Sequence, residues 1–501
     1  MAQKNLPPAT SFQLQFEKGL RVFLLLFAIF HMWISFARHF FAPENNISSS
    51  DTLLTLLKAE KWAGHLLLVA VIVYLILSRT RFKSTWLRIK TVIKGSMSRE
   101  MILLICLFVY SVYCCHIQSK SYTNIFKSAD LCLFDLAVCF FIFFLLPIML
   151  GTKKAKVYID ILLHAIMLIS TVFIVWALWN LLHLHLVSLP NGLQVGMTES
   201  CSFYPGVNEN IGAAIGTTMI LISMYMIATH RWTFKVVYSI ALIVHLFATL
   251  LTNSRGNYVA LLCALPLFIF MLVWLSSHKL STAQRILFSG IAAGVTAIAV
   301  WQLRHFVFWF FERITHFSEY LNVNMTGNDV VREVSVDPLR LKIWRSSAIR
   351  MISSGKVFFF GTPLGLIPES IHECMEKIYG TSRVYAHAHN IILQTGLVAG
   401  VPGMLLFLGF LCTMVLPCVR IGIGTKEKQL SGAYVLPIAV LCMLIVNMFE
   451  PFLLFYISVM ACLFFLFCGY IVAISREVPD PVTLTKDKSR NKSKKNKPSL
   501  T

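Results

Sequence analysis

The sequence predicts an all-α, polytopic helical membrane protein with about twelve transmembrane helices and one large loop on the exterior side. Of its 501 residues, 57% are hydrophobic and only 13% are charged, whereas a soluble protein of this size carries about a quarter charged residues. Several windows of about 20 apolar residues are long enough to cross a bilayer, and they are too uniformly apolar for barrel strands, which alternate. The spans are therefore expected to be helices.

Twelve apolar runs are expected to form these spans. They lie near residues 21–38, 62–78, 101–117, 130–150, 158–183, 209–229, 234–252, 257–276, 286–303, 390–417, 433–449 and 453–474. No small-residue cleavage site follows the first run, so it should remain as a span. The expected divisions are nine helices within 1–303, an exterior loop with amphipathic helices at 304–388, three helices within 389–475 and a basic, disordered tail at 476–501.

The distribution of basic residues predicts the orientation. The formal net charge is +21, and the lysines and arginines gather in alternate connections, as the positive-inside rule requires of cytoplasmic loops. These connections lie around 79–99, 153–156, 231–235, 279–285 and 420–428. Both termini are thus expected in the cytoplasm, and the charge indicates contact with membrane lipids rather than with nucleic acid.

The connection from Arg304 to Ala388 is by far the longest, and long loops are uncommon unless they are functional. It contains a predicted amphipathic helix that begins at Pro338 and lies against the membrane-facing surface of the bundle. The apolar face of this helix consists of Leu341, Trp344, Ala348 and Met351, and its polar face of Arg340, Lys342, Arg345 and Arg350. The basic residues of the loop indicate an anionic ligand, unless a long exported loop is simply indifferent to charge.

Two polar turns open predicted spans from the exterior side. Arg255 stands between Ser254 and Gly256. An arginine at the membrane costs about 2.5–3.5 kcal/mol on insertion scales, so this one marks an anion site or snorkels to the interface. Asn208 and Asn210 begin another span, where they suit sugar hydroxyls, although Asn208 equally suits a helix cap.

His387 and His389 precede the span at 390–417 and admit three interpretations. A metal site is weakly indicated, because histidines two residues apart do not share a helical face and no carboxylate or thiolate cluster accompanies them in the sequence. A structural histidine at a helix end is the second interpretation. The third is a general base, since a neutral imidazole accepts a proton near neutral pH. The sequence carries no Walker loop, dinucleotide fingerprint or nucleophile elbow, which disfavours ATP-driven transport and serine hydrolysis.

Most of the 13 cysteines fall inside apolar runs, where small buried hydrophobic residues are expected. Cys201 and Cys374 lie instead in segments placed outside the membrane. A disulfide between these two residues is a hypothesis that mass analysis with and without reductant would decide.

Four stretches, in this order, resemble the O-antigen ligase and O-antigen polymerase superfamily. They are Asn208 to Gly212, Thr252 to Gly256, Arg340 to Trp344 with Gly361 to Gly365 after it, and His389-Asn390 to Gly403. The last fits the ligase pattern of His, then Asn, Ser or Gln, then nine residues, Gly, two residues, and Gly, Thr or Tyr. The resemblance covers about 200 to 405 by motif and the rest of the chain by topology.

The resemblance implies a GT-C-like, metal-independent glycosyltransferase of the bacterial inner membrane, with its active site in the periplasm and no cofactor. The implied reaction moves a glycan from undecaprenyl pyrophosphate to a sugar hydroxyl of lipid A-core. His389 is expected to draw the proton from that hydroxyl or to orient it, and Arg255 and Arg340 to stabilise the pyrophosphate. Further candidates for substrate contacts are Asn390, Arg345, His387, Asn208, Asn210 and Trp344.

Three alternatives remain open at this stage. A polymerase would use the same donor with a second lipid-linked glycan as acceptor, and an oligosaccharyltransferase would glycosylate Ser or Thr of a protein. A non-enzymatic polysaccharide transporter would also be polytopic and basic, but it would need charged residues within spans rather than gathered at one exterior face. The fit of the histidine pattern favours the ligase, and the oligomeric state is left open.

Overall fold

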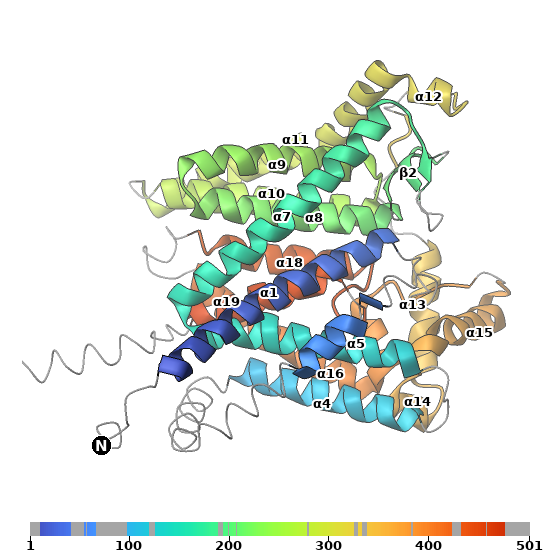
Figure 1. Ribbon diagram of the computed structural model, residues 1–501. Helices are drawn as coiled ribbons and strands as arrows, with labels where there is room; N and C mark the ends of the chain where they lie inside the picture. Colours follow the sequence, from blue (N-terminus) through green and yellow to red (C-terminus); the bar gives the residue numbers. More distant parts are fainter. Residues whose placement is uncertain are drawn as a thin grey trace, which may run out of the picture.

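The structure is a computed structural model that describes residues 11–41, 55–56, 58–66, 98–119, 126–188, 194–198, 200–206, 208–277, 280–324, 329–332, 338–381, 384–422, 432–456 and 458–475. These residues form a helical bundle (Figure 1). Its first half contains α1 (Ser11–Phe41), α4 (Arg99–Ser119), α5 (Phe126–Val138), the π-helix η2 (Cys139–Leu145), α6 (Leu146–Leu150), α7 (Thr152–Leu182), α8 (Glu209–Thr229) and α9 (Trp232–Leu251). Its second half contains α10 (Arg255–Ser276), α11 (Thr282–Thr315), α12 (Phe317–Tyr320), α13 (Pro338–Met351), α14 (Gly355–Phe360), the 3₁₀-helix η3 (Leu364–Leu366), α15 (Ile367–Tyr379), α16 (Ile391–Gly422), α18 (Val435–Asn447) and α19 (Val459–Ser475).

The prediction of a polytopic helical membrane protein is confirmed. Among the described residues, nine helices are long and apolar enough to cross a membrane, and α18 and α19 are shorter apolar helices. The expected span at 62–78 lies mostly outside the described residues, as does the basic tail at 476–501. The chain is therefore a multi-pass membrane protein whose helices follow the apolar runs of the sequence.

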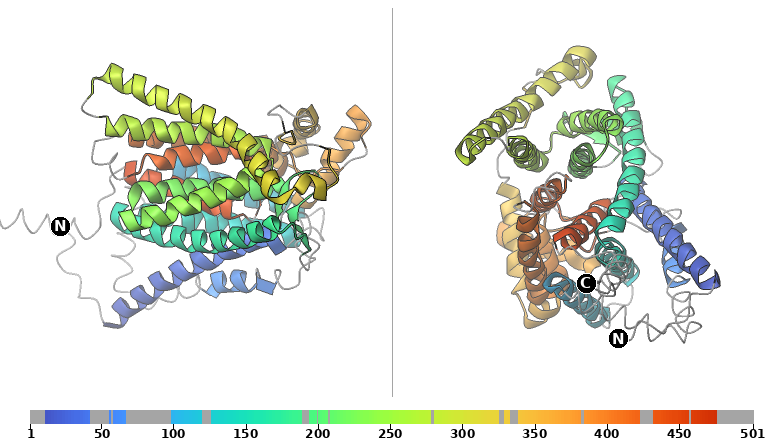
Figure 2. Two further views of the ribbon diagram at one scale, coloured as in Figure 1. Left: turned by 90° about the horizontal axis from the view of Figure 1, so that it is seen from above. Right: turned by 90° about the vertical axis from the view of Figure 1, so that its left-hand side faces the viewer.

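Helix α19 lies at the centre of the bundle. All its residues from Val459 to Ile474 are buried, and it packs against α1, η2, α6, α7, α8, α16 and α18 (Figures 1 and 2). A helix that is apolar on every side satisfies its backbone internally and loses nothing by full burial. The rim helices α9, α10 and α11 instead keep apolar side chains exposed, as lipid-facing helices do.

Short elements gather at one end of the bundle, which we call the loop end (Figure 1). Between α7 and α8 lies a small antiparallel sheet of order β1-β2-β3, formed by β1 (Val187–Ser188), β2 (Gln194–Met197) and β3 (Phe203–Pro205). Helices α12 to α15 occupy the same end, on the connection from α11 to α16. The expectation that this connection contains its own helices therefore agrees with the structure.

Helix α13 turns a different face inward from the one expected. Its buried residues are Ile343, Ser346, Ser347 and Met351, whereas Leu341 is 51% exposed. The inward face packs against α15 and α16. Two serines fit there because small side chains let helices approach closely. Of the predicted apolar stripe, Met351 is buried and Trp344 and Ala348 are half-buried, whereas the prediction for Leu341 was wrong. Neighbouring helices, and not hydrophobicity alone, select the buried face.

Helix α16 carries a kink at Ala399 and Gly400. Gly400 has a positive φ of 67°, and a Cβ there would lie 2.3 Å from the carbonyl O of Phe359. Gly361 has a φ of 73°, and its Cβ would lie 2.3 Å from the carbonyl O of Val398. Both positions need a left-handed backbone and close backbone approach, which only glycine provides without strain. The two glycines thus allow the backbone at the end of α14 to pack directly against the backbone of the kink in α16.

The carbonyls freed by the kink find new donors. The backbone N–H of Thr362 donates to the Leu397 carbonyl at 2.6 Å. Gln118 Nε2 of α4 donates to the carbonyls of Phe360 and Val398 at 2.6 and 3.1 Å. Such pairing is what makes a broken helix tolerable at membrane depth. The kink is consequently a fixed part of the fold.

Two further expectations need correction. Helix α11 continues to Thr315, so the exterior loop starts later than residue 304 and Arg304 lies within a helix. Neither Cys201 nor Cys374 forms a disulfide in the structure. Burial raises the pKa of each of these thiols, so they are weak nucleophiles. The hypothesis of a disulfide between them is not supported.

Candidate functional site

The two histidines lie on a short turn immediately before α16. Asn390 caps this helix, because its Oδ1 accepts from the backbone N–H groups of Ile392 and Leu393 at 2.9 and 3.1 Å. His389 has a positive φ of 49°. A side chain in this region costs about 1–3 kcal/mol and persists only where its surroundings fix it, often at functional sites. The oxygen of Asn390 is therefore used by the backbone, while His389 is held in a strained position.

Glu450 joins both histidines from the turn after α18. Its Oε1 lies 3.2 Å from His389 Nδ1, and its Oε2 lies 3.5 Å from His387 Nε2. The two imidazoles meet edge to face, with ring centroids 4.2 Å apart. Glu450 is 4% exposed. No carboxylate cluster stands next to the histidines in the sequence, and the fold brings this carboxylate to them from more than sixty positions away along the chain.

Arg340 of α13 completes the charge balance of this group. Its Nη2 lies 3.2 Å from Glu450 Oε1, the same oxygen that His389 contacts. Burial alone would raise the pKa of the Glu450 carboxyl, but His389, His387 and Arg340 outweigh burial and lower that pKa to about 2. Glu450 is thus an anion at neutral pH. We call Arg340, His387, His389 and Glu450 the histidine cluster.

The hydrogen bonds distinguish the two histidines. His387 Nδ1 accepts from the backbone N–H of His389 at 3.3 Å, so its Nε2 carries the proton and faces Glu450. Burial, aided by the nearby His389 and Arg340, lowers the pKa of His387 to about 3. His387 is therefore neutral, and both of its ring nitrogens are engaged. In His389 only Nδ1 contacts Glu450, which leaves Nε2 as the nitrogen with a free lone pair.

Helix α13 contributes a second contact to the histidine turn. Trp344 Nε1 donates to the His389 carbonyl at 3.1 Å. Arg345 follows directly in the sequence but is exposed. The structure therefore brings Arg340 and Trp344 into the histidine cluster, whereas Arg345 points toward the surroundings of the protein.

The start of α10 at Ser254, Arg255 and Gly256, which we call the arginine turn, lies beside Phe449, the residue before Glu450. A Cβ on Gly256 would sit 3.0 Å from the ring of Phe449, the neighbour of Glu450. The guanidinium of Arg340 lies over the same ring, 5.5 Å from its centroid. Arg255 is the first residue of α10 and the neighbour of Gly256. Phe449 thus packs between the Arg255 turn and Arg340, and these predicted arginines belong to one region.

The start of α8 supports the arginine turn from the other side. Ser254 Oγ donates to Asn210 Oδ1 at 2.8 Å, and Asn257 Nδ2 donates to Ser254 Oγ at 3.0 Å. Asn208 caps α8, since its side chain accepts from the backbone N–H of Asn210 at 2.9 Å. Asn210 therefore joins the starts of α8 and α10, and the cap expected as an alternative for Asn208 is the arrangement observed.

The connection from α11 to α16 is tied to the same turn. Asn253 Nδ2 donates to the Val330 carbonyl, and Asn253 Oδ1 accepts from the backbone N–H of Arg332, both at 3.0 Å. The Arg332 guanidinium lies 3.6 Å from Glu209 at the start of α8. These bonds place another cation next to the arginine turn. The loop end thus gathers positive charge above the starts of α8 and α10.

The histidine cluster contains three groups that could hold a metal ion. Ligand atoms of His387, His389 and Glu450 all lie within 4.8 Å of one another. However, Oε1 of Glu450 already faces the cation Arg340. His387 would also have to give up its hydrogen bond to the backbone of His389. The arrangement suits a proton-transfer pair better than a metal ligand set.

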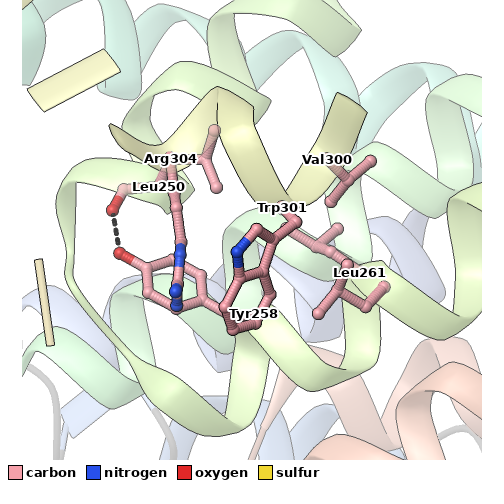
Figure 3. A pocket seen from close by; sticks show the side chains of 7 residues that line it. Leu250, Tyr258, Leu261, Val300, Trp301 and Arg304 are labelled. Atoms are coloured by element: carbon pink, nitrogen blue, oxygen red, sulfur yellow. Dashed lines mark hydrogen bonds between the residues drawn. The ribbon is translucent and has the colours of Figure 1, made fainter. Parts of the chain in front are cut away.

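Arg304 lies in a separate pocket between α10 and α11 (Figure 3). Its guanidinium stacks on Trp301 at 3.8 Å and lies 5.6 Å from the ring centroid of Tyr258. Tyr258 donates its hydroxyl to the Leu250 carbonyl at 2.6 Å, the bond drawn in Figure 3. Aromatic faces stabilise a guanidinium where water is excluded. This arginine therefore has its own surroundings, apart from the histidine cluster.

Glu450 is the member of the site that sequence reasoning missed. It is the one acidic residue in the connection between the spans expected at 433–449 and 453–474. The sequence signal that could have identified Glu450 is its position. It is a lone carboxylate between two apolar runs, on the same predicted side as two histidines and several arginines. Nothing in the sequence shows which of these cations it would meet.

Residues 240–408 match a family model described as O-antigen ligase. The matched segment contains the arginine turn, α13 and the histidine turn, but ends before Glu450. Comparison with curated proteins gives no match.

Proposed function

Because the chain belongs to the O-antigen ligase and polymerase superfamily, whose members are glycosyltransferase-like enzymes, we propose that it is an O-antigen ligase. It moves a glycan from undecaprenyl pyrophosphate to a sugar hydroxyl of lipid A-core. The observation that carries this proposal is the pairing of His389 with a buried, ionised Glu450 beside Arg340. Glu450 holds Nδ1 of His389, and Nε2 of His389 remains to accept a proton. The neighbouring cation Arg340 suits a donor that carries phosphate.

His389 serves the acceptor. The negative charge of Glu450 favours the proton on Nδ1 of His389, so that Nε2 carries the lone pair. The acceptor hydroxyl attacks the anomeric carbon of the donor glycan, and Nε2 takes the proton from that hydroxyl as the new C–O bond forms. Glu450 then stabilises the resulting imidazolium. His387 orients this pair through its contacts with the His389 backbone and with Glu450.

The arginines serve the donor. The bond from the anomeric carbon to undecaprenyl pyrophosphate breaks, and negative charge grows on the departing pyrophosphate. Guanidinium groups bind phosphate oxygens bidentately and act without a metal ion. Arg340 uses one donor nitrogen on Glu450 and keeps further N–H groups for phosphate. Arg255 approaches from the start of α10, where the exposed backbone amides also favour an anion.

We place the enzyme in the bacterial inner membrane with both termini in the cytoplasm and the loop end in the periplasm. The gathering of basic residues in alternate connections supports this orientation. The lipid-linked donor then reaches Arg255 from within the membrane, and the acceptor reaches His389 from the same leaflet. The reaction needs neither a cofactor nor a metal ion in this arrangement.

A polymerase is the second candidate, because it shares the donor and the superfamily. Its acceptor is another lipid-linked glycan. A protein oligosaccharyltransferase is the third, with a Ser or Thr hydroxyl as acceptor. The ligase is preferred for the fit of the sequence from His389 to Gly403 with the ligase pattern. A non-enzymatic transporter is disfavoured, because its mechanism contains no proton-transfer step that the His389–Glu450 pair would serve.

Complementation of two null strains tests the choice. In a ligase-null strain, expression of the chain is expected to restore the ladder of lipid A-core-linked polymer on lipopolysaccharide gels. Restored chain extension in a polymerase-null strain, without laddering in the ligase-null strain, would assign the polymerase instead. The His389→Ala variant, with expression checked by immunoblotting, is the catalytic control. Glycosylated protein in place of laddering would assign the third candidate.

A further inference from the structure

A second group of polar side chains is buried inside the bundle and includes none of the residues of the histidine cluster. Its members are His31 of α1, Glu60 of the helical segment 58–66, Asp135 of α5, Cys139 of η2 and Cys462 of α19. Each of these residues is at most 4% exposed. They come from four distant parts of the sequence, and none of them takes part in the proposed transfer reaction. We call them the intramembrane cluster.

The geometry of this cluster resembles a ligand set. The Nε2 atom of His31 lies 3.1 Å from Asp135 Oδ1, and Cys139 Sγ lies 3.9 Å from Asp135 Oδ2. The possible ligand atoms of His31, Cys139 and Cys462 all lie within 4.8 Å of one another. Around a tetrahedral zinc ion with bonds of about 2.0–2.3 Å, ligand atoms are separated by roughly 3.2–3.8 Å. The separations of Asp135 from His31 and from Cys139, 3.1 and 3.9 Å, are close to these values.

The cluster is costly without an additional partner. Within the described part of the chain, Glu60 Oε2 is a buried atom without a hydrogen bond, and His31 Nε2 and Asp135 Oδ1 face each other at 3.1 Å. Two carboxylates and an imidazole at this depth are rare in membrane proteins and mark sites by default. A cation at their centre would use these atoms and offset the negative charge.

We propose that the intramembrane cluster binds a zinc ion through His31 Nε2, Asp135 and the thiolates of Cys139 and Cys462. Nitrogen, thiolate and carboxylate donors in a four-coordinate set are those that zinc prefers. Binding replaces the two thiol protons, which are released to solvent. The ion is structural, because all four ligands are buried and leave no open position for a substrate.

Glu60 takes the supporting role of an outer residue. Its Oε1 lies 2.5 Å from Nδ1 of His31, the nitrogen that faces away from Asp135. Histidine ligands usually donate this second N–H to a carboxylate, which fixes the ring and makes the ligating nitrogen more basic. The pairing of His31 with Glu60 on one side and Asp135 on the other follows this pattern.

Two features of the backbone and the charge agree with the assignment. Cys139 begins the seven-residue π-helix η2, and π-helical turns occur frequently at functional sites. Two thiolates neutralise the zinc ion, and the carboxylates of Asp135 and Glu60 each add one negative charge. The buried guanidinium of Arg38, 7% exposed, acts electrostatically on Asp135 and offsets one of these two charges. The ion would tie the beginning of the chain to the central helix α19.

Metal analysis of the full-length protein tests the proposal. The protein is purified with a tag that contains no histidine, and zinc is measured by mass spectrometry of the elements. About one zinc per chain is expected, and the Cys139→Ser and Cys462→Ser variants are expected to lose at least about nine-tenths of it. Cys468→Ser is the matched control, because this thiol is equally buried on α19 but has no place in the cluster. Wild-type protein without zinc, or zinc retained in both variants, would overturn the proposal.

Two measurements do not depend on how well the variants fold. Wild-type protein from cobalt-supplemented cells is expected to show thiolate-to-cobalt charge-transfer absorption, and absence of this band with cobalt bound would overturn the thiolate ligands. Mass analysis under non-reducing conditions is expected to find Cys139 and Cys462 unlinked. A disulfide between them would also overturn the site. Zinc lost from Glu450→Gln but kept in Cys139→Ser would assign the metal to the histidine cluster instead.

Discussion

Replacing Glu450 by glutamine keeps the shape of the side chain and removes its charge, so it isolates what the carboxylate does. In the structure this carboxylate faces His389, His387 and Arg340 at 3.2, 3.5 and 3.2 Å. Without the negative charge, the proton of His389 is no longer favoured on Nδ1, and the imidazolium loses its counter-ion. General-base catalysis contributes about 10²–10⁴-fold. The Glu450→Gln variant is therefore expected to transfer glycan at least about 100-fold more slowly, equivalent to about 2.7 kcal/mol.

The same substitution should have a defined effect on stability. The pKa of Glu450 falls from an ordinary 4.5 to about 2 in the folded protein, which corresponds to about 3 kcal/mol of stabilisation of the charged form. A lowered carboxyl pKa stabilises the fold above the unfolded pKa and loses that contribution as the pH falls through the folded pKa. The thermal midpoints of wild type and Glu450→Gln should thus differ at pH 7 and converge between about pH 4.5 and pH 2.

Two assays measure these effects separately. Transfer is followed with purified protein, undecaprenyl pyrophosphate-linked glycan and lipid A-core on gels, and unfolding by intrinsic fluorescence in detergent. Glu369→Gln is the matched control, because this carboxylate of α15 is exposed and should change neither result. Wild-type transfer by Glu450→Gln at every pH would refute the role of the carboxylate in holding His389. A stability difference that persists unchanged at pH 2 would refute the charge pairing.

Three further predictions follow from the site and the kink. His389→Ala and Arg255→Ala should each abolish detectable transfer while leaving expression intact, and full activity in either variant removes that residue from the mechanism. Gly400→Ala should destabilise the protein by more than about 1–3 kcal/mol, because the added Cβ would meet the Phe359 carbonyl. Gly409→Ala on the same helix is the control, because its Cβ meets only ordinary contacts and the substitution should be tolerated. Equal thermal midpoints of the two variants would contradict this explanation. Transfer should continue after brief exposure to chelator, and immediate, metal-reversible loss would contradict metal-free chemistry.

Much of the bundle could be predicted because the membrane constrains the sequence strongly. The run at 209–229 coincides with α8, since an asparagine cap and uniform hydrophobicity mark both the start and the course of the helix. The end of α11 was misjudged at Arg304. A charged residue usually ends a span, but here Trp301 and Tyr258 stack on the guanidinium and the helix continues. Only a tertiary contact reveals this exception.

The arginines and histidines of the candidate site could be predicted from the sequence, whereas Glu450 could not. Arginines and histidines at the starts of apolar runs stand out, because charge at a membrane boundary is costly. Glu450 does not stand out, since its importance comes from meeting His389 and Arg340 across the fold. The buried face of α13 was missed for a related reason. Ser346 and Ser347 are buried because α15 and α16 leave room only for small side chains, and hydrophobic spacing carries no information about that room.

The central position of α19 also determines the order in which the protein can assemble. It is the last of the described helices to leave the ribosome, yet it contacts helices made throughout synthesis. Proteins begin to fold from the N-terminal end as they are made, so the outer helices must meet before their shared partner exists. The preceding turn brings Glu450 only at this late stage. A chain that ends before Glu450 and α19 therefore lacks both the filled centre of the bundle and the carboxylate of the histidine cluster.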